Sequence, residues 1–213
     1  MQKICLGAVA AVAACGVTSI ASADTISFQF NDPAVPSTFQ ADAVLTDVAG
    51  GVEVKLTANL GIGPGDMLGF FFDLGDEALI GNAPNVGFAA LAGLDTNVTA
   101  TEFKVNSVRK IGGGNVIVGK NGVAFDGGVE LGDSGSSGGM VTSATFVLSS
   151  SHGDLDVSDF FNQRFGLRVQ STGSDNEDSL KLFAFAPASV PEPGVAFASA
   201  GLLGGLALRR RRA

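Results

Sequence analysis

The side chains that could carry chemistry are few, and most of them are acidic. The chain of 213 residues has one histidine, no tryptophan or tyrosine, and 21 acidic against 13 basic residues. Three serines precede His152 and Asp154 follows it, but the members of a catalytic triad meet through the fold rather than by adjacency. The nucleophile-elbow pattern Gly-x-Ser-x-Gly is also absent. We therefore interpret His152 as an exposed loop residue and predict that the protein is not an enzyme.

Carboxylates gather in four short stretches, at 73–77, 126–133, 154–159 and 175–178. Calcium binds six to eight oxygens, often from carboxylates on a turn. The spacing Asp154-x-Asp156-x-x-Asp159 resembles half of such a loop, although it lacks the glycine and the distal glutamate of an EF-hand. Asp154, Asp156 and Asp159 are thus candidate calcium ligands, and solvated loop charge is the alternative. No other cofactor is predicted.

Sugar chemistry is harder to locate in the sequence. A glycoside hydrolase needs two carboxylates that flank the sugar, and among so many acids the sequence singles out no pair. A polysaccharide hydrolase is therefore a less favoured alternative. Phe160 and Phe161 are the one aromatic pair beside a polar loop; we interpret them as core residues, and a ligand platform is the alternative. We expect the other phenylalanines to lie in the core, because a phenyl ring has no polar edge.

The elements that must position these residues are strands. Apolar and polar residues alternate in several short runs that glycine-rich turns separate, which predicts an antiparallel β-sandwich, jelly-roll-like, over residues 24–189. Gly50-Gly51 and Asn121-Gly122 are hairpin signals. Residues 84–94 are predicted as a short helix or loop, and 158–164 as one helical turn with Ser158 as N-cap. The predicted strands are 26–30, 52–60, 67–74, 98–108, 115–120, 123–125, 142–148, 165–171 and 180–186.

The N-terminus has the features of a secretory signal peptide, residues 1–23. Lys3 is followed by an apolar run over 4–14 that is too short to span a bilayer, and Ala21 and Ala23 form the small-x-small cleavage pattern. Both cysteines, Cys5 and Cys15, lie within this segment, so the mature chain has no disulfide. Lipidation at Cys15, which ends a lipobox-like stretch, is the alternative to cleavage after Ala23.

The C-terminal segment, residues 190–213, has three parts. Val190, Pro191, Glu192 and Pro193 come first, residues 195–208 carry no charge, and Arg209, Arg210, Arg211 and Arg212 follow. A helix of 14 residues covers about 21 Å, less than the hydrocarbon core of about 30 Å, so we expect a short membrane helix. The arginine cluster places its far end in the cytoplasm.

This order of Pro-Glu-Pro motif, apolar segment and arginine cluster closely resembles the PEP-CTERM sorting signal of Gram-negative bacteria. The resemblance covers residues 190–213 and implies that exosortase, an integral-membrane protease, recognises and removes this segment. It also implies a host that makes exopolysaccharide and biofilm, and transient anchoring in the inner membrane. The resemblance concerns sorting and does not assign an activity to the middle domain.

The charge balance restricts the partners of the exported part. Residues 24–192 hold eight basic residues and all 21 acidic ones, so we expect no binding to nucleic acid, and repulsion of acidic polymers unless a divalent cation bridges them. The sequence predicts a non-catalytic protein of the cell surface or extracellular matrix, associated with exopolysaccharide and processed by signal peptidase and exosortase. A calcium-dependent carbohydrate-binding module is the alternative.

Overall fold

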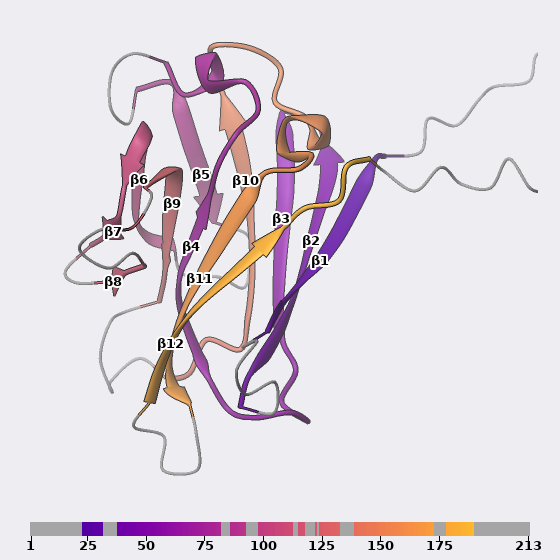
Figure 1. Ribbon diagram of the computed structural model, residues 1–213. Coiled ribbons are helices and arrows are strands. Elements are labelled where there is room, and N and C mark those ends of the chain that lie inside the picture. Colours follow the sequence, from indigo (N-terminus) through magenta and orange to yellow (C-terminus); the bar gives the residue numbers. More distant parts are fainter. Residues whose placement is uncertain are drawn as a thin grey trace, which may run out of the picture.

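The chain folds into two packed antiparallel sheets, as the alternating runs predict (Figure 1). The computed structural model describes residues 23–31, 38–81, 86–92, 98–112, 115–117, 122, 124–132, 139–172 and 178–189. The predicted signal peptide up to residue 22 and the sorting segment 190–213 lie outside the described residues. Within the described part, no helix is both long enough and apolar enough to cross a membrane.

Each sheet has five strands in an order that differs from the order along the chain. The first sheet runs β1-β2-β3-β10-β5, with β1 Thr25–Asn31, β2 Gln40–Val48, β3 Gly51–Ala58, β10 Ser143–Ser150 and β5 Phe88–Ala92. The second runs β12-β11-β4-β9-β6, with β12 Asp178–Phe185, β11 Arg164–Thr172, β4 Asp66–Phe72, β9 Phe125–Leu131 and β6 Val98–Val108. A small pair, β7 Lys110–Ile111 and β8 Asn115–Val116, and two 3₁₀ turns, η1 Glu77–Leu79 and η2 Val157–Phe160, complete the described elements.

Alternation along β3 shows how the sequence builds the first sheet. Val52, Val54 and Leu56 are fully buried, whereas the residues between them face outward. β2 and β3 pair from Ala41–Ala58 to Val48–Gly51, so Ala49 and Gly50 form the two-residue loop. Gly50 has a φ of 90°, a left-handed conformation that glycine adopts without strain. The hairpin predicted at Gly50-Gly51 is therefore confirmed.

Phenylalanines fill the space between the sheets. Phe70 of β4 lies at the centre, with ring centroids 5.7 Å from Phe146, 5.7 Å from Phe165 and 6.4 Å from Phe30. All four side chains are fully buried. Edge-to-face and tilted contacts of this kind add to the stability that comes from apolar burial alone. The prediction that most phenylalanines belong to the core is confirmed.

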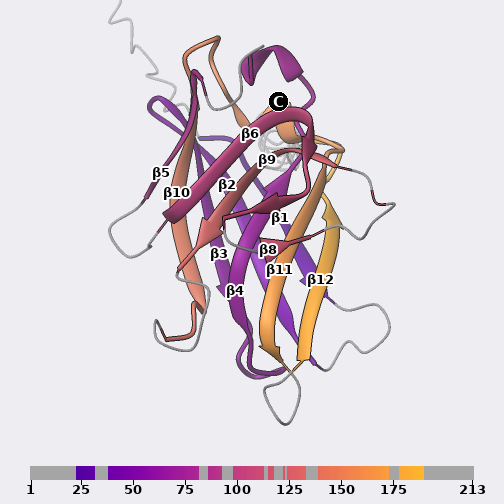
Figure 2. The ribbon, with the colours of Figure 1, turned by 90° about the vertical axis from the view of Figure 1, so that its left-hand side faces the viewer.

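A second, smaller apolar cluster lies on the outer face of the second sheet. It contains Phe71, Val108, Ile111, Ile117 and Phe125. Ile111 of β7 and Ile117, which follows β8, thus cover part of the face over β4 and β9. β11 and β12 lie side by side at one edge of this sheet (Figure 2), and Phe183 and Phe185 of β12 are exposed.

Several predicted elements differ from the structure. Residues 88–92 are the strand β5 rather than a helix. β8 pairs with β7 rather than with residues 123–125, and the turn residue Asn121 lies outside the described residues. The helical turn predicted over 158–164 is the shorter 3₁₀ turn at 157–160, and Arg164 already belongs to β11. Its N-cap is Asp156 and not Ser158, because the Asp156 carboxylate accepts the Ser158 amide.

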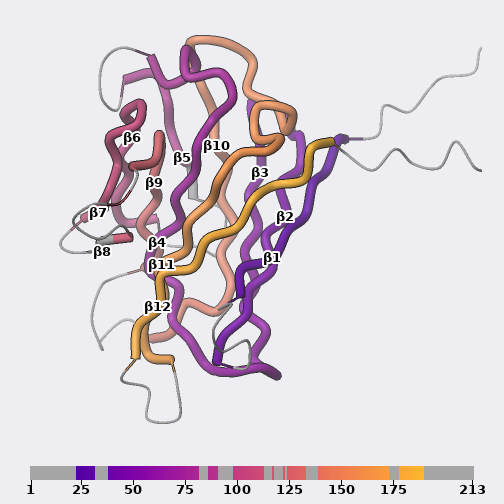
Figure 3. The backbone as a smooth tube through the Cα atoms, viewed as in Figure 1, coloured from indigo at the N-terminus to yellow at the C-terminus, as the bar shows by residue number. Residues whose placement is uncertain are grey.

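The first and last described residues lie at the same end of the sandwich. β1 and β12 are neighbours across the two sheets, and the chain enters β1 at the end where it leaves β12 (Figure 3). The 3₁₀ turn η2 lies at this end too, since Asn162 and Gln163 pair with Pro187 and Ala186 beyond β12. Whatever precedes residue 23 or follows residue 189 therefore starts from one end of the domain.

Candidate functional site

The three predicted calcium ligands lie around η2, but two of them have structural partners. Asp156 Oδ1 accepts the amide of Ser158 at 2.7 Å, and Asp159 Oδ2 accepts the amide of Asp156 at 3.0 Å. This reciprocal arrangement is a capping box, which satisfies amides that the start of a helical turn leaves free. Asp47 from β2 accepts the amide of Val157 at 2.7 Å and fixes the turn against the first sheet.

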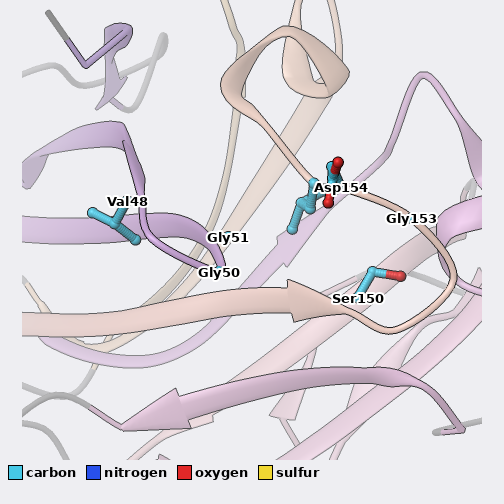
Figure 4. Close-up of a pocket in the computed structure, with 7 residues that line it drawn as sticks. Val48, Gly50, Gly51, Ser150, Gly153 and Asp154 are labelled. Atoms are coloured by element: carbon cyan, nitrogen blue, oxygen red, sulfur yellow. The ribbon is translucent and has the colours of Figure 1, made fainter. Parts of the chain in front are cut away.

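Asp154, the third predicted ligand, lines a cavity of about 270 Å³ between the β2–β3 turn and the segment after β10 (Figure 4). Its walls are otherwise uncharged: Val48, Gly50, Gly51, Ser150, Gly153 and Leu155. The Ser150 hydroxyl donates to the Leu79 carbonyl at 2.7 Å and accepts the His152 amide at 3.0 Å. Among the described residues, no three His, Cys, Asp or Glu side chains come together in a group able to hold a metal.

His152 lies on the surface, as predicted, and contacts a neighbouring segment. Its Nε2 is 3.0 Å from the Val86 carbonyl, and its ring lies against Gly81 and Gly87. Its amide donates to the Ser150 hydroxyl, and its Nε2 contacts a backbone carbonyl, which is not the arrangement of a catalytic triad. The histidine therefore joins the segment after β10 to the segment around residue 86.

Carboxylates from two predicted acidic stretches meet at the end of β4. Asp73 forms a salt bridge of 2.9 Å with Arg164 of β11. Asp126, on β9 and 2% exposed, accepts the amides of Leu74 at 3.0 Å and Asn106 at 2.6 Å. Asn106 in turn donates to Glu77 at 2.7 Å. The sequence could not single out Asp73 and Asp126 as neighbours, because they come from separate strands that only the folded sheet brings together.

The surroundings of these carboxylates shift their protonation. Burial raises the pKa of Asp73 to about 6, although the Arg164 guanidinium acts in the opposite direction, and the nearby Asp126 charge adds to the rise. Burial also raises the pKa of Asp126, against the effect of its two amide donors. Asp73 therefore changes charge in the mildly acidic range, and Arg164 then loses its anionic partner.

Arg164 connects this carboxylate pair to an aromatic surface. Its Cζ lies 4.4 Å from the centre of the Phe125 ring, a cation–π contact, and its Nη2 donates to the Ala124 carbonyl at 2.8 Å. Phe125 stacks on Phe183 of β12, with centroids 6.3 Å apart and planes 6° apart. Gly166 makes room for this arrangement, because a Cβ there would lie only 3.0 Å from the Phe125 ring.

The outer side of β12 presents the largest exposed aromatic side chains of the described chain. Phe183 is 47% exposed and Phe185 68% exposed, and Lys181 is exposed on the same side. In the register of β11 and β12, Lys181 lies opposite Arg168, and Phe185 opposite Arg164. We call these five residues the aromatic–cationic face: Lys181, Phe183 and Phe185 of β12 with Arg164 and Arg168 of β11.

The exposed aromatic residues are not the pair that the sequence offers as an alternative platform. Phe160 is fully buried and Phe161 packs partly buried against the core, so the core interpretation of this pair is confirmed and the platform alternative is wrong. The available signal was the alternation in β12, where Leu182 and Ala184 face the core and Phe183 and Phe185 face outward. Because both sets are apolar, the sequence alone does not show which of the two faces solvent.

The remaining predicted site residues have little or no structural description. Ala23 is exposed, and the amide of Asp47 bonds to the carbonyl of Asp24 beside it at 2.9 Å. Ala21, the Val190–Pro193 motif and the arginine cluster lie outside the described residues. A scan against protein-family models and searches of curated proteins and of solved structures found nothing that matches this chain.

Proposed function

We propose that this chain is an exported, non-catalytic protein of the cell surface or extracellular matrix, sorted by its PEP-CTERM-like tail. Signal peptidase would release residues 1–23 and exosortase would remove the tail after transient anchoring in the inner membrane. The observation that carries this proposal is the tail itself, with Pro191-Glu192-Pro193, an uncharged stretch and four arginines in order. The middle domain would then remain outside the cell as a β-sandwich module.

The position of the termini supports a tethered domain. Residues 23 and 189 lie at one end of the sandwich, so a signal peptide and a membrane segment could reach the same bilayer without unfolding the sheets. The opposite end, with the turns around residues 59–65, would point away from the membrane. The chain alternates between the two sheets along β3, β4, β5 and β6, which supports describing the sandwich as jelly-roll-like.

The carboxylate geometry favours a non-catalytic role over a hydrolase. Asp126 is almost completely buried, with its oxygens held by two backbone amides, and Asp73 is paired with Arg164. A glycoside hydrolase must bring both carboxylates to the bond that it cleaves. The structure instead gives this protein an exposed surface on β11 and β12 that suits binding.

The sorting proposal is tested by mass and location in the native host. The intact mass of the wild-type protein should show loss of residues 1–23 and a cut close to residue 190. Deletion of Pro191–Arg212 should leave the protein unprocessed at its C-terminus and move it away from the cell surface. Replacing the four arginines with glutamine is the matched control for charge alone. An unchanged mass and location of the deletion variant would contradict the proposal.

The same measurement separates the two N-terminal alternatives. Cleavage after Ala23 gives a chain that starts at Asp24 and carries no lipid. A mass increase by acyl groups on a chain that starts at Cys15 would show lipoprotein processing instead. Cys15→Ser should leave the first product unchanged and abolish the second.

A further inference from the structure

We propose that the aromatic–cationic face binds a linear anionic polysaccharide directly, with no calcium bridge. The proposal rests on the proposed function only for where the protein meets such a polymer. The whole-chain charge predicts repulsion of acidic polymers, but the charge on β11 and β12 is locally reversed. The aromatic–cationic face can therefore attract an anion although the whole domain is acidic.

Two positively charged side chains form a cross-strand pair on the aromatic–cationic face. Arg168 and Lys181 lie directly opposite each other in the β11–β12 register. Like charges in this position are destabilising. Neither forms a salt bridge with a described carboxylate, and Nη1 of Arg168 makes only long bonds to two backbone carbonyls, Leu180 at 3.3 Å and Val169 at 3.5 Å. An anionic ligand that lies between the two side chains would relieve their repulsion.

Two exposed phenylalanine rings lie on the same face as this pair of charges. Phe183 stacks on Phe125, and the Phe125 ring is itself buried against Phe71 and the Arg164 guanidinium, so the orientation of Phe183 is fixed before any ligand binds. Phe185 continues the row two residues further and is the most exposed of the large apolar side chains described. Exposed apolar groups rimmed by polar ones mark interaction surfaces, and fixed rings bind at low entropic cost. The apolar face of a sugar ring can lie on such a ring.

A thin polymer fits the narrow row of exposed side chains on β12. Lys181, Phe183 and Phe185 follow one another about 7 Å apart along one strand, so an extended chain can contact all three. Lys181 and the opposing Arg168 supply positive charge for an anionic chain. A bilayer and a second copy of the protein are the other occupants, and the test below separates them from the polymer.

The test measures binding of the protein purified after export by its host to polygalacturonate in EDTA, with dextran as the neutral comparison. We expect binding to polygalacturonate only. Phe185→Ala and Lys181→Gln should each weaken it by about tenfold, the usual effect of removing a main contact. Lys55→Gln, an exposed lysine on β3 of the other sheet, is the matched charge control and should change affinity less than twofold. Thermal unfolding of each variant checks that the fold is intact.

Four results would overturn the proposal. These are absence of binding in EDTA, equal affinity of the Phe185→Ala and wild-type proteins, stronger binding to phosphatidylglycerol vesicles than to polygalacturonate, and sedimentation that shows Phe185-dependent self-association. The vesicle result would assign the face to membranes, and the sedimentation result to a second copy. Each is independent of the processing test, because a correctly sorted protein can fail here and a protein that binds polygalacturonate can still be missorted.

Discussion

Replacing Asp73 with asparagine should stabilise the sandwich at neutral pH, although the carboxylate forms a salt bridge with Arg164. Burial raises the pKa of Asp73 from 3.8 to about 6 in spite of the attraction to Arg164. The ionised form is therefore less favourable in the folded chain than in the unfolded one. Asparagine has nearly the same shape and no charge, so it removes this cost while it keeps an oxygen for the guanidinium.

The pH dependence follows from the direction of the shift. Between 3.8 and about 6 the folded chain binds more protons at Asp73 than the unfolded chain, so the free energy of unfolding falls as the pH rises through this window. A difference of about two pKa units corresponds to about 3 kcal/mol. We reduce this to about 2 kcal/mol because about a fifth of the side chain is exposed and water screens its charge. Burial also raises the pKa values of Asp47, Asp126 and Asp159, which adds to the same trend.

Urea unfolding at pH 5.0 and 7.5, at constant ionic strength, measures the effect. Asp73→Asn should exceed the wild type in stability by about 2 kcal/mol at pH 7.5 and by about half to two-thirds of that at pH 5.0. Asp42→Asn, at an exposed residue of β2, is the matched control for the loss of one negative charge. A loss of stability at pH 7.5 for Asp73→Asn would refute the reasoning, because it would mean that the ion pair outweighs the cost of burial.

Three further predictions concern the core, a turn and the acidic loop. Phe70→Ala should lower the free energy of unfolding by about 3–5 kcal/mol in urea titrations, since it empties the centre of the core, and a loss below 1 kcal/mol would show that the sheets close over the space. Gly51→Ala should prevent correct pairing of β3 with β10, because its Cβ would collide with the Leu148 carbonyl of β10; heteronuclear NMR spectra that match the wild type would contradict this. Calcium and magnesium should raise the melting temperature equally, since Asp156 and Asp159 already cap η2, and a specific rise with calcium that Asp154→Asn abolishes would restore the calcium site.

Much of the fold could be predicted because, along a strand with one buried face, apolar residues that point into the core alternate with polar residues that face solvent. β3 and β11 each have every second side chain in the core, and their sequences show it. β9 was missed because Gly127 and Gly128 interrupt its apolar pattern. Both glycines are required by aromatic neighbours, since a Cβ at either position would meet the ring of Phe72 or Phe71 or the side chain of Ile111. A local pattern cannot contain this information, because the neighbours come from other strands.

The surface sites were harder to predict for a related reason. Phe183 and Phe185 look like core residues, and only the place of β12 at the edge of its sheet leaves them uncovered. The Asp73–Arg164 pair joins residues far apart in the sequence. The cap at η2 was assigned to Ser158 because serine is a common N-cap, but Asp156 precedes it by two residues and its carboxylate is the better acceptor.

The shared location of the two chain ends has a mechanical consequence for an attached protein. Phe185, the last residue of β12, is only a few residues from the point where the chain leaves the sandwich. If a polymer pulls on the face while the C-terminus is held, tension passes along β12 alone and bypasses the other strands. Such a load would act on the β11–β12 ladder at one sheet edge, and the phenylalanine core would stay unloaded.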